Sequence, residues 1–102
     1  MTLTDKTGAP VTVTKHPDRF TIEVDGQQVG LLDYQDRDGR RAFPHTEVDE
    51  SFGGRGLGTI VVAEALAATR AEGLRIVPIC SMVQAYVDKH HEYDDIVDQP
   101  TS

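Results

Sequence analysis

The chain has 102 residues, enough for one compact domain and too few for two. Its formal net charge of −7 disfavours nucleic acid as a partner and favours a cationic one such as an amine. No apolar run approaches the roughly 20 residues of a membrane helix, and residues 1–5 lack the features of a signal peptide. A single cysteine, Cys80, rules out an internal disulfide and suits a reducing compartment. We therefore expect a cytoplasmic protein with no membrane and no nucleic-acid partner.

The first half of the chain has the pattern of an antiparallel meander. Residues 1–10 are polar and are expected to be loose or to form an irregular lead-in. Asp25-Gly26 and the segment 37–40 are typical of tight turns, and Pro44 indicates an edge or an irregularity in the last strand. Apolar and β-branched side chains predict strands over 11–14, 19–24, 28–34 and 41–48.

The second half of the chain alternates helices with one strand. An apolar run predicts a helix over residues 57–72, and Gly73 after it suits a left-handed C-cap. A short buried strand is predicted over 74–80. Ser81 is then expected to be the N-cap of a second helix that runs from residue 82 to about residue 90.

This order of elements predicts an α/β (α+β) fold, with a mixed, mostly antiparallel sheet and helices packed on it. The first helix crosses over between the strands at 41–48 and 74–80, so these two strands are expected to run parallel. We expect a single domain over residues 1–102, with its core at about 11–97 and a frayed acidic tail over 92–102.

The segment Phe52-Gly53-Gly54-Arg55-Gly56-Leu57-Gly58 carries the strongest functional signal, with four glycines among six residues directly before the first helix. Glycine allows positive φ angles and the close approach of other atoms. The first amides of a helix lack internal partners, and the helix dipole adds positive charge to them. The segment therefore indicates a binding site for a phosphate or pyrophosphate. Arg55 is the candidate for the positive charge that such an anion needs.

Two common phosphate-binding motifs do not fit this segment. A Walker A loop needs Lys and then Ser or Thr after its last glycine, whereas Gly58 is followed by Thr59-Ile60. The dinucleotide-binding fingerprint needs a third glycine at the position where Val61 stands.

A third motif fits better, because residues 50–59 resemble the acetyl-coenzyme A signature of the GNAT superfamily of N-acetyltransferases. That signature is Arg or Gln, two variable residues, Gly, one variable residue, then Gly or Ala. Gly56 and Gly58 match its small positions, whereas Gly53 replaces Arg or Gln and removes one donor to the pyrophosphate. The resemblance to the small stand-alone branch of the superfamily covers residues 19–97. It is carried by the segments His45-Thr46-Glu47-Val48, Val77-Pro78-Ile79-Cys80 and Tyr86-Val87-Asp88-Lys89-His90-His91-Glu92-Tyr93, with Ser81 and His91 where the branch more often has Pro.

The resemblance implies an acetyl-CoA-dependent N-acetyltransferase. The acetyl group of the cofactor, acetyl-CoA, would pass to the amine of a small molecule or protein by direct attack in a ternary complex. The two parallel strands that end near Val48 and Cys80 would be splayed, with the pantetheine arm between them. The resemblance, the glycine segment and the expected placement of Lys89 give these cofactor-binding candidates: Val48, Gly53, Gly54, Arg55, Gly56, Leu57, Gly58, Thr59 and Lys89.

The catalytic candidates are Cys80, Tyr86, His45 and Glu47. Cys80 is either an acid or acyl acceptor at the leaving sulfur or a small buried hydrophobic residue. Tyr86 matches the tyrosine that many relatives use as the acid for the thiolate, or it packs between helix and sheet. His45 and Glu47 alternate onto one face of a strand, where they act as the base for the amine or form a solvated polar pair.

Two rival functions stay open: a module that binds coenzyme A without turnover, and a protein-interaction domain without a cofactor. No metal site is expected, because the adjacent His90 and His91 would point about 100° apart on a helix. The acceptor amine and the choice between monomer and homodimer also stay open.

Overall fold

The computed structural model describes residues 3–100, and in this part of the chain the strands form one six-stranded sheet in sequential order. Neighbouring strands are antiparallel, except that the last two are parallel. The strands are β1 (Leu3–Thr4), β2 (Pro10–Lys15), β3 (Arg19–Val24), β4 (Gln27–Arg37), β5 (Arg40–Val48) and β6 (Arg75–Val77). The helices are α1 (Leu57–Ala71) and α2 (Ser81–Lys89), with 3-10 turns η1 (Glu50–Phe52) and η2 (His91–Ile96). The predicted mixed, mostly antiparallel α/β fold is confirmed, as is the parallel pairing across the first helix.

The two long hairpins turn on Asp-Gly pairs. Asp25 and Asp38 have φ angles of 51° and 53°, and Gly26 and Gly39 follow with 82° and 76°. Two successive residues with positive φ are required by the type I′ turn, whose twist matches that of the flanking strands. Both predicted turns are therefore confirmed, and β4 extends to Arg37, beyond its predicted end at residue 34.

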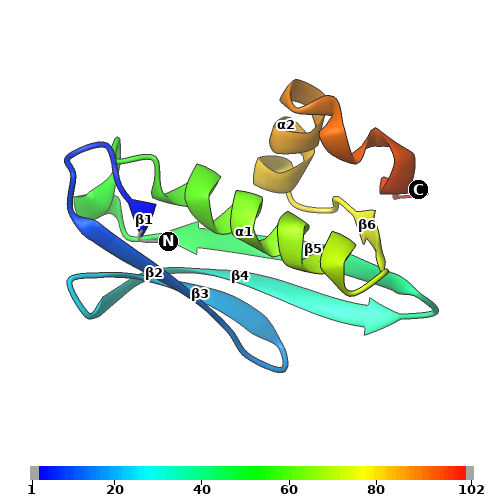
Figure 1. Ribbon diagram of the computed structural model, residues 1–102, viewed down its shortest axis with the longest axis horizontal. Coiled ribbons are helices and arrows are strands. Elements are labelled where there is room, and N and C mark those ends of the chain that lie inside the picture. The colour runs from blue at the N-terminus through cyan, green and yellow to red at the C-terminus, as the bar shows by residue number, and fades with distance from the viewer. Residues whose placement is uncertain (1–2, 101–102) are drawn as a thin grey trace.

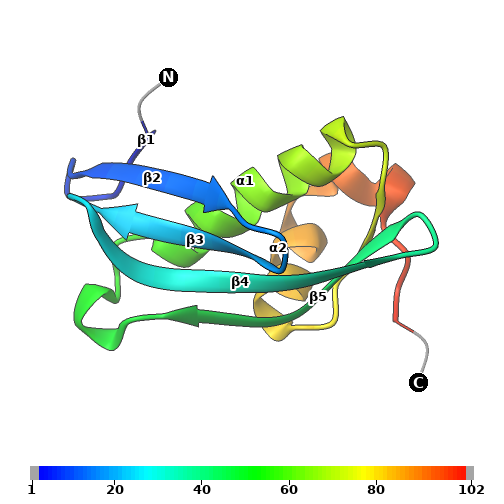
Figure 2. The same ribbon diagram turned by 90° about the horizontal axis from the view of Figure 1, so that it is seen from below.

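One face of the sheet forms the core with α1. Figure 1 shows α1 lying across the sheet with α2 beside it, and Figure 2 shows the opposite face of β3, β4 and β5 without a helix over it. Burying one large apolar side chain contributes roughly 1.5–3 kcal/mol. Side chains that are at most 3% exposed include Phe20, Ile22, Leu32, Phe43, Val61, Val62, Leu66 and Ile76.

The N-terminal segment is more ordered than its polarity indicated. The expectation of a loose lead-in is wrong for residues 3–9, because Leu3 and Thr4 pair with β2. Asp5 closes the turn between β1 and β2: its Oδ1 accepts hydrogen bonds from the Thr7 amide (2.8 Å), the Thr7 hydroxyl (2.6 Å) and the Ala9 amide (3.1 Å). Residues 1–2 lie outside the described residues.

The acidic tail is also ordered where it was expected to fray. Tyr93 in η2 is buried, and Val97 forms a parallel bridge with Ile76 of β6. Two arginines hold this segment: Arg70 bonds Asp95 at 2.7 Å, and Arg75 bonds Asp98 at 2.8 and 2.9 Å. The expectation of fraying is therefore wrong for residues 92–98, because the carboxylates have cationic partners on α1 and β6. Residues 101–102 lie outside the described residues.

Two predicted boundaries near the second helix are also wrong. β6 ends at Val77 rather than at residue 80, and Pro78 follows it with no amide hydrogen to donate to a ladder. α2 begins at Ser81, and its N-cap is Cys80, whose backbone is extended and whose side chain makes no capping hydrogen bond. By contrast, Gly73 follows α1 with a φ of 73°, as predicted for a left-handed C-cap.

Arg41 is the largest fully buried side chain, and it ties the β4–β5 hairpin to the end of α1. Its Nε and Nη2 donate to the carboxylate of Asp36 at 2.7 and 2.8 Å, and its Nη1 and Nη2 donate to that of Glu72 at 2.9 and 3.0 Å. The guanidinium also lies 4.5 Å from the ring centroid of Tyr34. The hydrogen bonds that Arg41 donates to Asp36 and then to Glu72 raise the pKa of Arg41 against the effect of burial, and those donated to Glu72 lower the pKa of Glu72.

Replacing Arg41 with Ala should lower the free energy of unfolding by about 3 kcal/mol, because it removes a large buried side chain together with its hydrogen bonds to two carboxylates. The stability of Arg41→Lys should lie between those of the wild type and Arg41→Ala, since an ammonium keeps the charge but lacks the planar arrangement of donors of a guanidinium. Chemical denaturation gives the comparison. Arg37→Ala, at a side chain that is 90% exposed, is the control and should change stability by less than about 0.5 kcal/mol. Equal losses for the Arg41 and Arg37 variants would contradict this role.

Candidate functional site

The site begins where β5 and β6 part. The two strands pair only through Arg40–Ala42 and Arg75–Val77. The Cys80 amide then donates to the Phe43 carbonyl at 2.8 Å, and the chain turns into α2. β5 continues to Val48, and within residues 3–100 no strand pairs with the edge of residues 44–48 that faces away from β4. The structure thus leaves an unpaired strand edge beside the start of α1.

The glycine segment forms the turn between β5 and α1. Gly54 and Gly56 have φ angles of 77° and 76°, a conformation that L side chains rarely adopt. Gly56 is the N-cap of α1, no side chain caps the helix, and its first turn contains no acidic residue. The first amides of α1 therefore keep their hydrogen-bonding capacity for an anion, as the sequence predicted.

Gly58 allows three elements to meet closely. A Cβ built at Gly58 would lie 2.7 Å from the Met82 sulfur on α2 and 3.8 Å from Val48 Cγ2 on β5. Gly53 differs, because its φ of −62° suits any residue. The glycine that replaces the Arg or Gln of the signature is therefore not required by its own backbone conformation.

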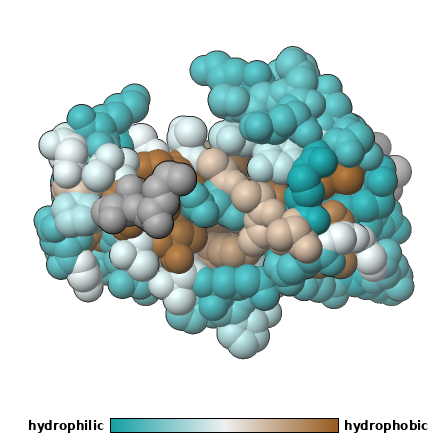
Figure 3. Space-filling model, in the orientation of Figure 1, coloured by the Kyte–Doolittle hydropathy of each residue, from teal (hydrophilic) through white to brown (hydrophobic). Residues whose placement is uncertain are grey.

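Most of the predicted cofactor-binding residues line one pocket of about 260 Å³ at the start of α1. An adjoining pocket of about 270 Å³ lies between α1 and α2 and contains Tyr86 and Lys89. The two pockets share Thr59 and Met82, and Figure 3 shows the surface hollowed between α2 and the turn before α1. The lining of the first pocket is Val48, Phe52, Gly53, Gly54, Gly56, Leu57, Gly58, Thr59 and Met82.

Arg55 is the predicted cofactor residue that lies outside both of these pockets. Its Nε donates to Asp5 Oδ2 at 2.7 Å, its Nη2 donates to Thr7 Oγ1 at 3.2 Å, and its guanidinium stacks 5.0 Å from the Phe52 ring centroid. The Asp5 side chain is fully buried. Arg55 is thus committed to holding the N-terminal segment against the glycine segment.

Cys80 lies where β5 and β6 separate, whereas Tyr86 lies in the pocket between α1 and α2. The Cys80 sulfur lies 3.1 Å from the Thr46 hydroxyl, so β5 and the start of α2 are linked there by a hydrogen bond. Tyr86 stacks on His90, with ring centroids 4.3 Å apart. Burial, with a smaller contribution from the charge of Glu92, raises the pKa of the Tyr86 phenol. Its hydroxyl is therefore protonated at neutral pH and can donate a proton.

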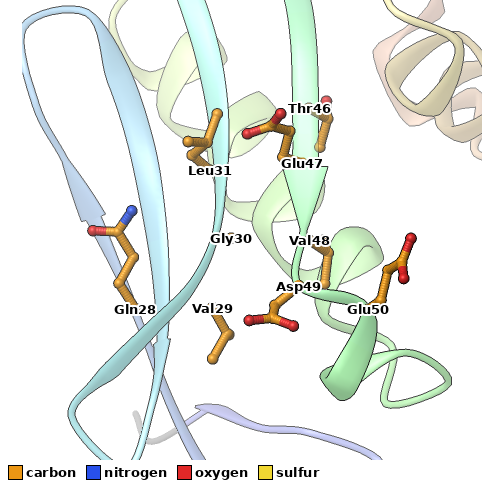
Figure 4. A pocket seen from close by; sticks show the side chains of 9 residues that line it. All are labelled: Gln28, Val29, Gly30, Leu31, Thr46, Glu47, Val48, Asp49 and Glu50. Carbon is orange, nitrogen blue, oxygen red and sulfur yellow. The ribbon is translucent and has the colours of Figure 1, made fainter.

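His45 and Glu47 meet on the opposite side of β5. His45 Nε2 lies 3.1 Å from Glu47 Oε1, and both side chains are more than half exposed, at 54% and 64%. Glu47 also lines a pocket of about 580 Å³ whose other walls include Leu31, Asp49 and Glu50. Figure 4 shows the Glu47 carboxylate directed toward β4, whereas Thr46 projects on the other side of β5. His45 and Glu47 therefore lie on the face of β5 opposite Thr46, the residue that contacts Cys80.

Four contributors to this region were not identified from the sequence: Asp5, Lys6, Thr46 and Met82. The turn at Asp5 had a local signal, since Asp followed by Thr-Gly two residues later is typical of a side-chain-stabilised turn. The other contacts join residues far apart in the chain, and no local pattern indicates them.

Within residues 3–100, no group of three or more His, Cys, Asp or Glu side chains is placed to hold a metal ion. No helix in the same range is long and apolar enough to cross a bilayer.

Known proteins resemble this chain in sequence and in fold. The family described as GCN5-related N-acetyl-transferase matches residues 19–96. Among solved structures, the NMR solution structure of a GCN5-like candidate N-acetyltransferase from Staphylococcus aureus superposes with a TM-score of 0.68, covering 88% of this chain and 90% of that one at 21% identity. At that identity the likeness concerns the fold alone. No curated protein matches the sequence significantly.

The Asp5 contacts predict a pH dependence of stability. Hydrogen bonds, first from the Thr7 hydroxyl and then from the Thr7 and Ala9 amides, lower the pKa of Asp5 from 3.8 to about 2, although burial opposes them. A lowered pKa stabilises the fold above the unfolded value, and this stabilisation is lost as the pH falls through the folded value. The difference in unfolding free energy between the wild type and Asp5→Asn should therefore shrink between pH 4 and pH 2. A difference in unfolding free energy that stays constant from pH 4 to pH 2 would contradict the prediction.

Proposed function

The chain belongs to the GCN5-related N-acetyltransferase family, whose members are acyltransferases, and we propose that it transfers the acetyl group of acetyl-CoA to an amine. The observation that carries the proposal is one juxtaposition. The uncapped start of α1, with its glycine turn, opens beside the unpaired half of β5. An anion site and a free strand edge are what a diphosphate with an extended amide-containing arm requires.

The residues at the start of α1 fit the diphosphate. Positive φ angles at Gly54 and Gly56 turn the backbone, and Gly58 has no Cβ that would meet Met82. The amides of Leu57, Gly58 and Thr59 can then donate to phosphate oxygens with the helix dipole behind them. Because Arg55 is paired with Asp5, these backbone amides supply the main contacts.

The arm of the cofactor is proposed to bind along residues 44–48 of β5. An extended chain with amide groups can add to a free strand edge as a further strand, through main-chain hydrogen bonds. Val48 lines the pocket at the start of α1, so the free edge runs directly into the diphosphate site. Thr46 and Cys80 lie farther along the same edge, where the arm would carry its thioester.

Acetyl transfer then needs an acceptor base and a donor acid. The amine nitrogen attacks the thioester carbonyl, a C–N bond forms, the C–S bond breaks, and the sulfur leaves with the electron pair. Glu47, with His45 at 3.1 Å, is proposed to take the proton from the amine, directly or through water. Tyr86, whose pKa is raised, is proposed to return a proton to the thiolate, with Cys80 as the alternative donor.

The acceptor is proposed to enter from the open face of the sheet. The pocket of about 580 Å³ drawn in Figure 4 is lined by the carboxylates of Glu47, Asp49 and Glu50. Such a wall favours a positively charged amine, in agreement with the net charge of −7. A small polyamine and a protein amine both meet this requirement.

A second candidate function, coenzyme A binding without turnover, is favoured by Gly53 and Arg55. Glycine stands at the Arg or Gln position of the signature, and Arg55 is held by Asp5. Both features weaken the side-chain contribution to the diphosphate site. They leave the catalytic candidates unaffected, so turnover distinguishes the two functions.

Incubation of the protein with acetyl-CoA and a panel of primary amines should release free coenzyme A thiol, measured by a thiol-reactive dye. Turnover should increase with pH through the titration of the amine, since only the neutral amine attacks. A shift in melting temperature with coenzyme A but no thiol release for any amine would favour the binding module. Neither a shift nor release would contradict both functions.

Tyr86→Phe should lower kcat by about 100-fold and leave the dissociation constant of coenzyme A within about 2-fold, because a general acid acts on the chemical step. Tyr93→Phe is the matched control, since Tyr93 is buried nearby and its phenol also has a raised pKa. Equal kcat values for the two variants would show that Tyr86 only packs. Cys80→Ala in the same assay tests the alternative donor.

A further inference from the structure

The diphosphate site proposed above has too little positive charge for its ligand. None of the residues that line the pocket at the start of α1 is basic. The signature position for Arg or Gln is Gly53, and the guanidinium of Arg55 is neutralised by the fully buried carboxylate of Asp5 at 2.7 Å. A diphosphate in a protein of net charge −7 needs a cation from elsewhere.

The turn between β1 and β2 brings Lys6 next to Gly56, one of the residues that line this pocket. The Lys6 amide donates to the Arg55 carbonyl at 3.0 Å, while Arg55 itself bonds the side chains of the two neighbours of Lys6, Asp5 and Thr7. Three contacts therefore fix residues 5–7 against the glycine segment. The backbone of Lys6 is positioned by the same ion pair that removes Arg55 from the pocket.

The stem of Lys6 lies over Gly56, the N-cap of α1. A Cβ built at Gly56 would lie 3.2 Å from Lys6 Cε, 3.4 Å from Cγ and 3.6 Å from Cδ, so the whole stem follows the glycine backbone. The ammonium is one bond beyond Cε. The stem thus lies beside the N-cap of α1, and a lysine side chain is flexible enough for its ammonium to reach an anion bound at the uncapped amides.

The Lys6 ammonium is free for a ligand. Among the ion pairs of residues 3–100 Lys6 takes part in none, whereas Lys15 lies 3.6 Å from Glu72. The Lys6 side chain is exposed, and a lysine is a mobile point charge that can follow a phosphate oxygen. Lys89, the other lysine near the site, lines the adjoining pocket between α1 and α2.

We propose that Lys6 is a cofactor-binding residue that contacts the diphosphate of coenzyme A, in place of the side chain that Gly53 lacks. This inference rests on the proposed function. It assigns to the N-terminal segment, which lies outside the matched residues 19–96, a direct part in the site. The Asp5–Arg55 pair then has the role of positioning Lys6.

Isothermal titration with coenzyme A, 3′-dephospho-coenzyme A and pantetheine tests the proposal on Lys6→Gln, Lys6→Arg and the wild type. Lys6→Gln should lower the affinity for both diphosphate ligands by about 10-fold, which is the usual effect of losing one charge-assisted hydrogen bond. The affinity for pantetheine should not change. Lys6→Arg should stay within about 3-fold of the wild type. Arg37→Gln makes the same change in net charge at the exposed β4–β5 turn and is the matched control.

The outcomes separate this inference from the function on which it rests. Wild-type protein that binds none of the three ligands would overturn the proposed function and the role of Lys6 together. Equal affinities of the wild type and Lys6→Gln for coenzyme A would overturn the role of Lys6 and leave the proposed function standing. An equal loss for pantetheine would overturn it too, because the lysine would then act through the shape of the loop.

Discussion

The early end of the pairing between β5 and β6 is the constraint on which the rest of the structure depends. β6 contributes only Arg75–Val77, Pro78 follows with no amide hydrogen, and one further backbone hydrogen bond from Cys80 to Phe43 ends the contact with β5. β5 meanwhile runs on to Val48 because its other edge is held by β4. Strand length and one proline therefore create a half-paired strand without local strain. The glycine turn and the start of α1 lie at the open end of that strand.

At each end of the region where β5 and β6 separate, an arginine ion pair with one buried partner joins distant segments. At the paired end, Arg41 links the β4–β5 hairpin to Glu72 after α1. At the open end, Arg55 links the glycine segment to Asp5, fifty residues earlier in the chain. α1 thus has a fixed position at both of its ends. A site formed by the start of α1 and the edge of β5 needs a fixed distance between these two elements, and no hydrogen-bond ladder joins them.

The sequence predicted the parts of this structure that depend on neighbouring residues. The Asp-Gly turns, the alternation in β3 and the Gly73 cap are local patterns, and they placed most elements to within a few residues. Lone charged residues were read as solvated or as ligand contacts, because a sequence does not show a partner thirty or fifty positions away. For that reason the sequence carries no prediction for Arg41 or Asp5, and it wrongly predicts that the acidic tail frays. The glycine segment is recognisable because its signal is a contiguous run of glycines directly before a helix.

The alternation of side chains along β5 divides the proposed reaction between two faces of one strand. Thr46 and Val48 project toward the helices, where the cofactor arm is proposed to lie, and His45 and Glu47 project to the open face. The proposed reaction needs a general base and a general acid. On opposite faces they can act on different atoms, the base on the incoming amine and the acid on the leaving sulfur. In this proposal the acetyl group passes from the cofactor to the amine across the free edge of β5.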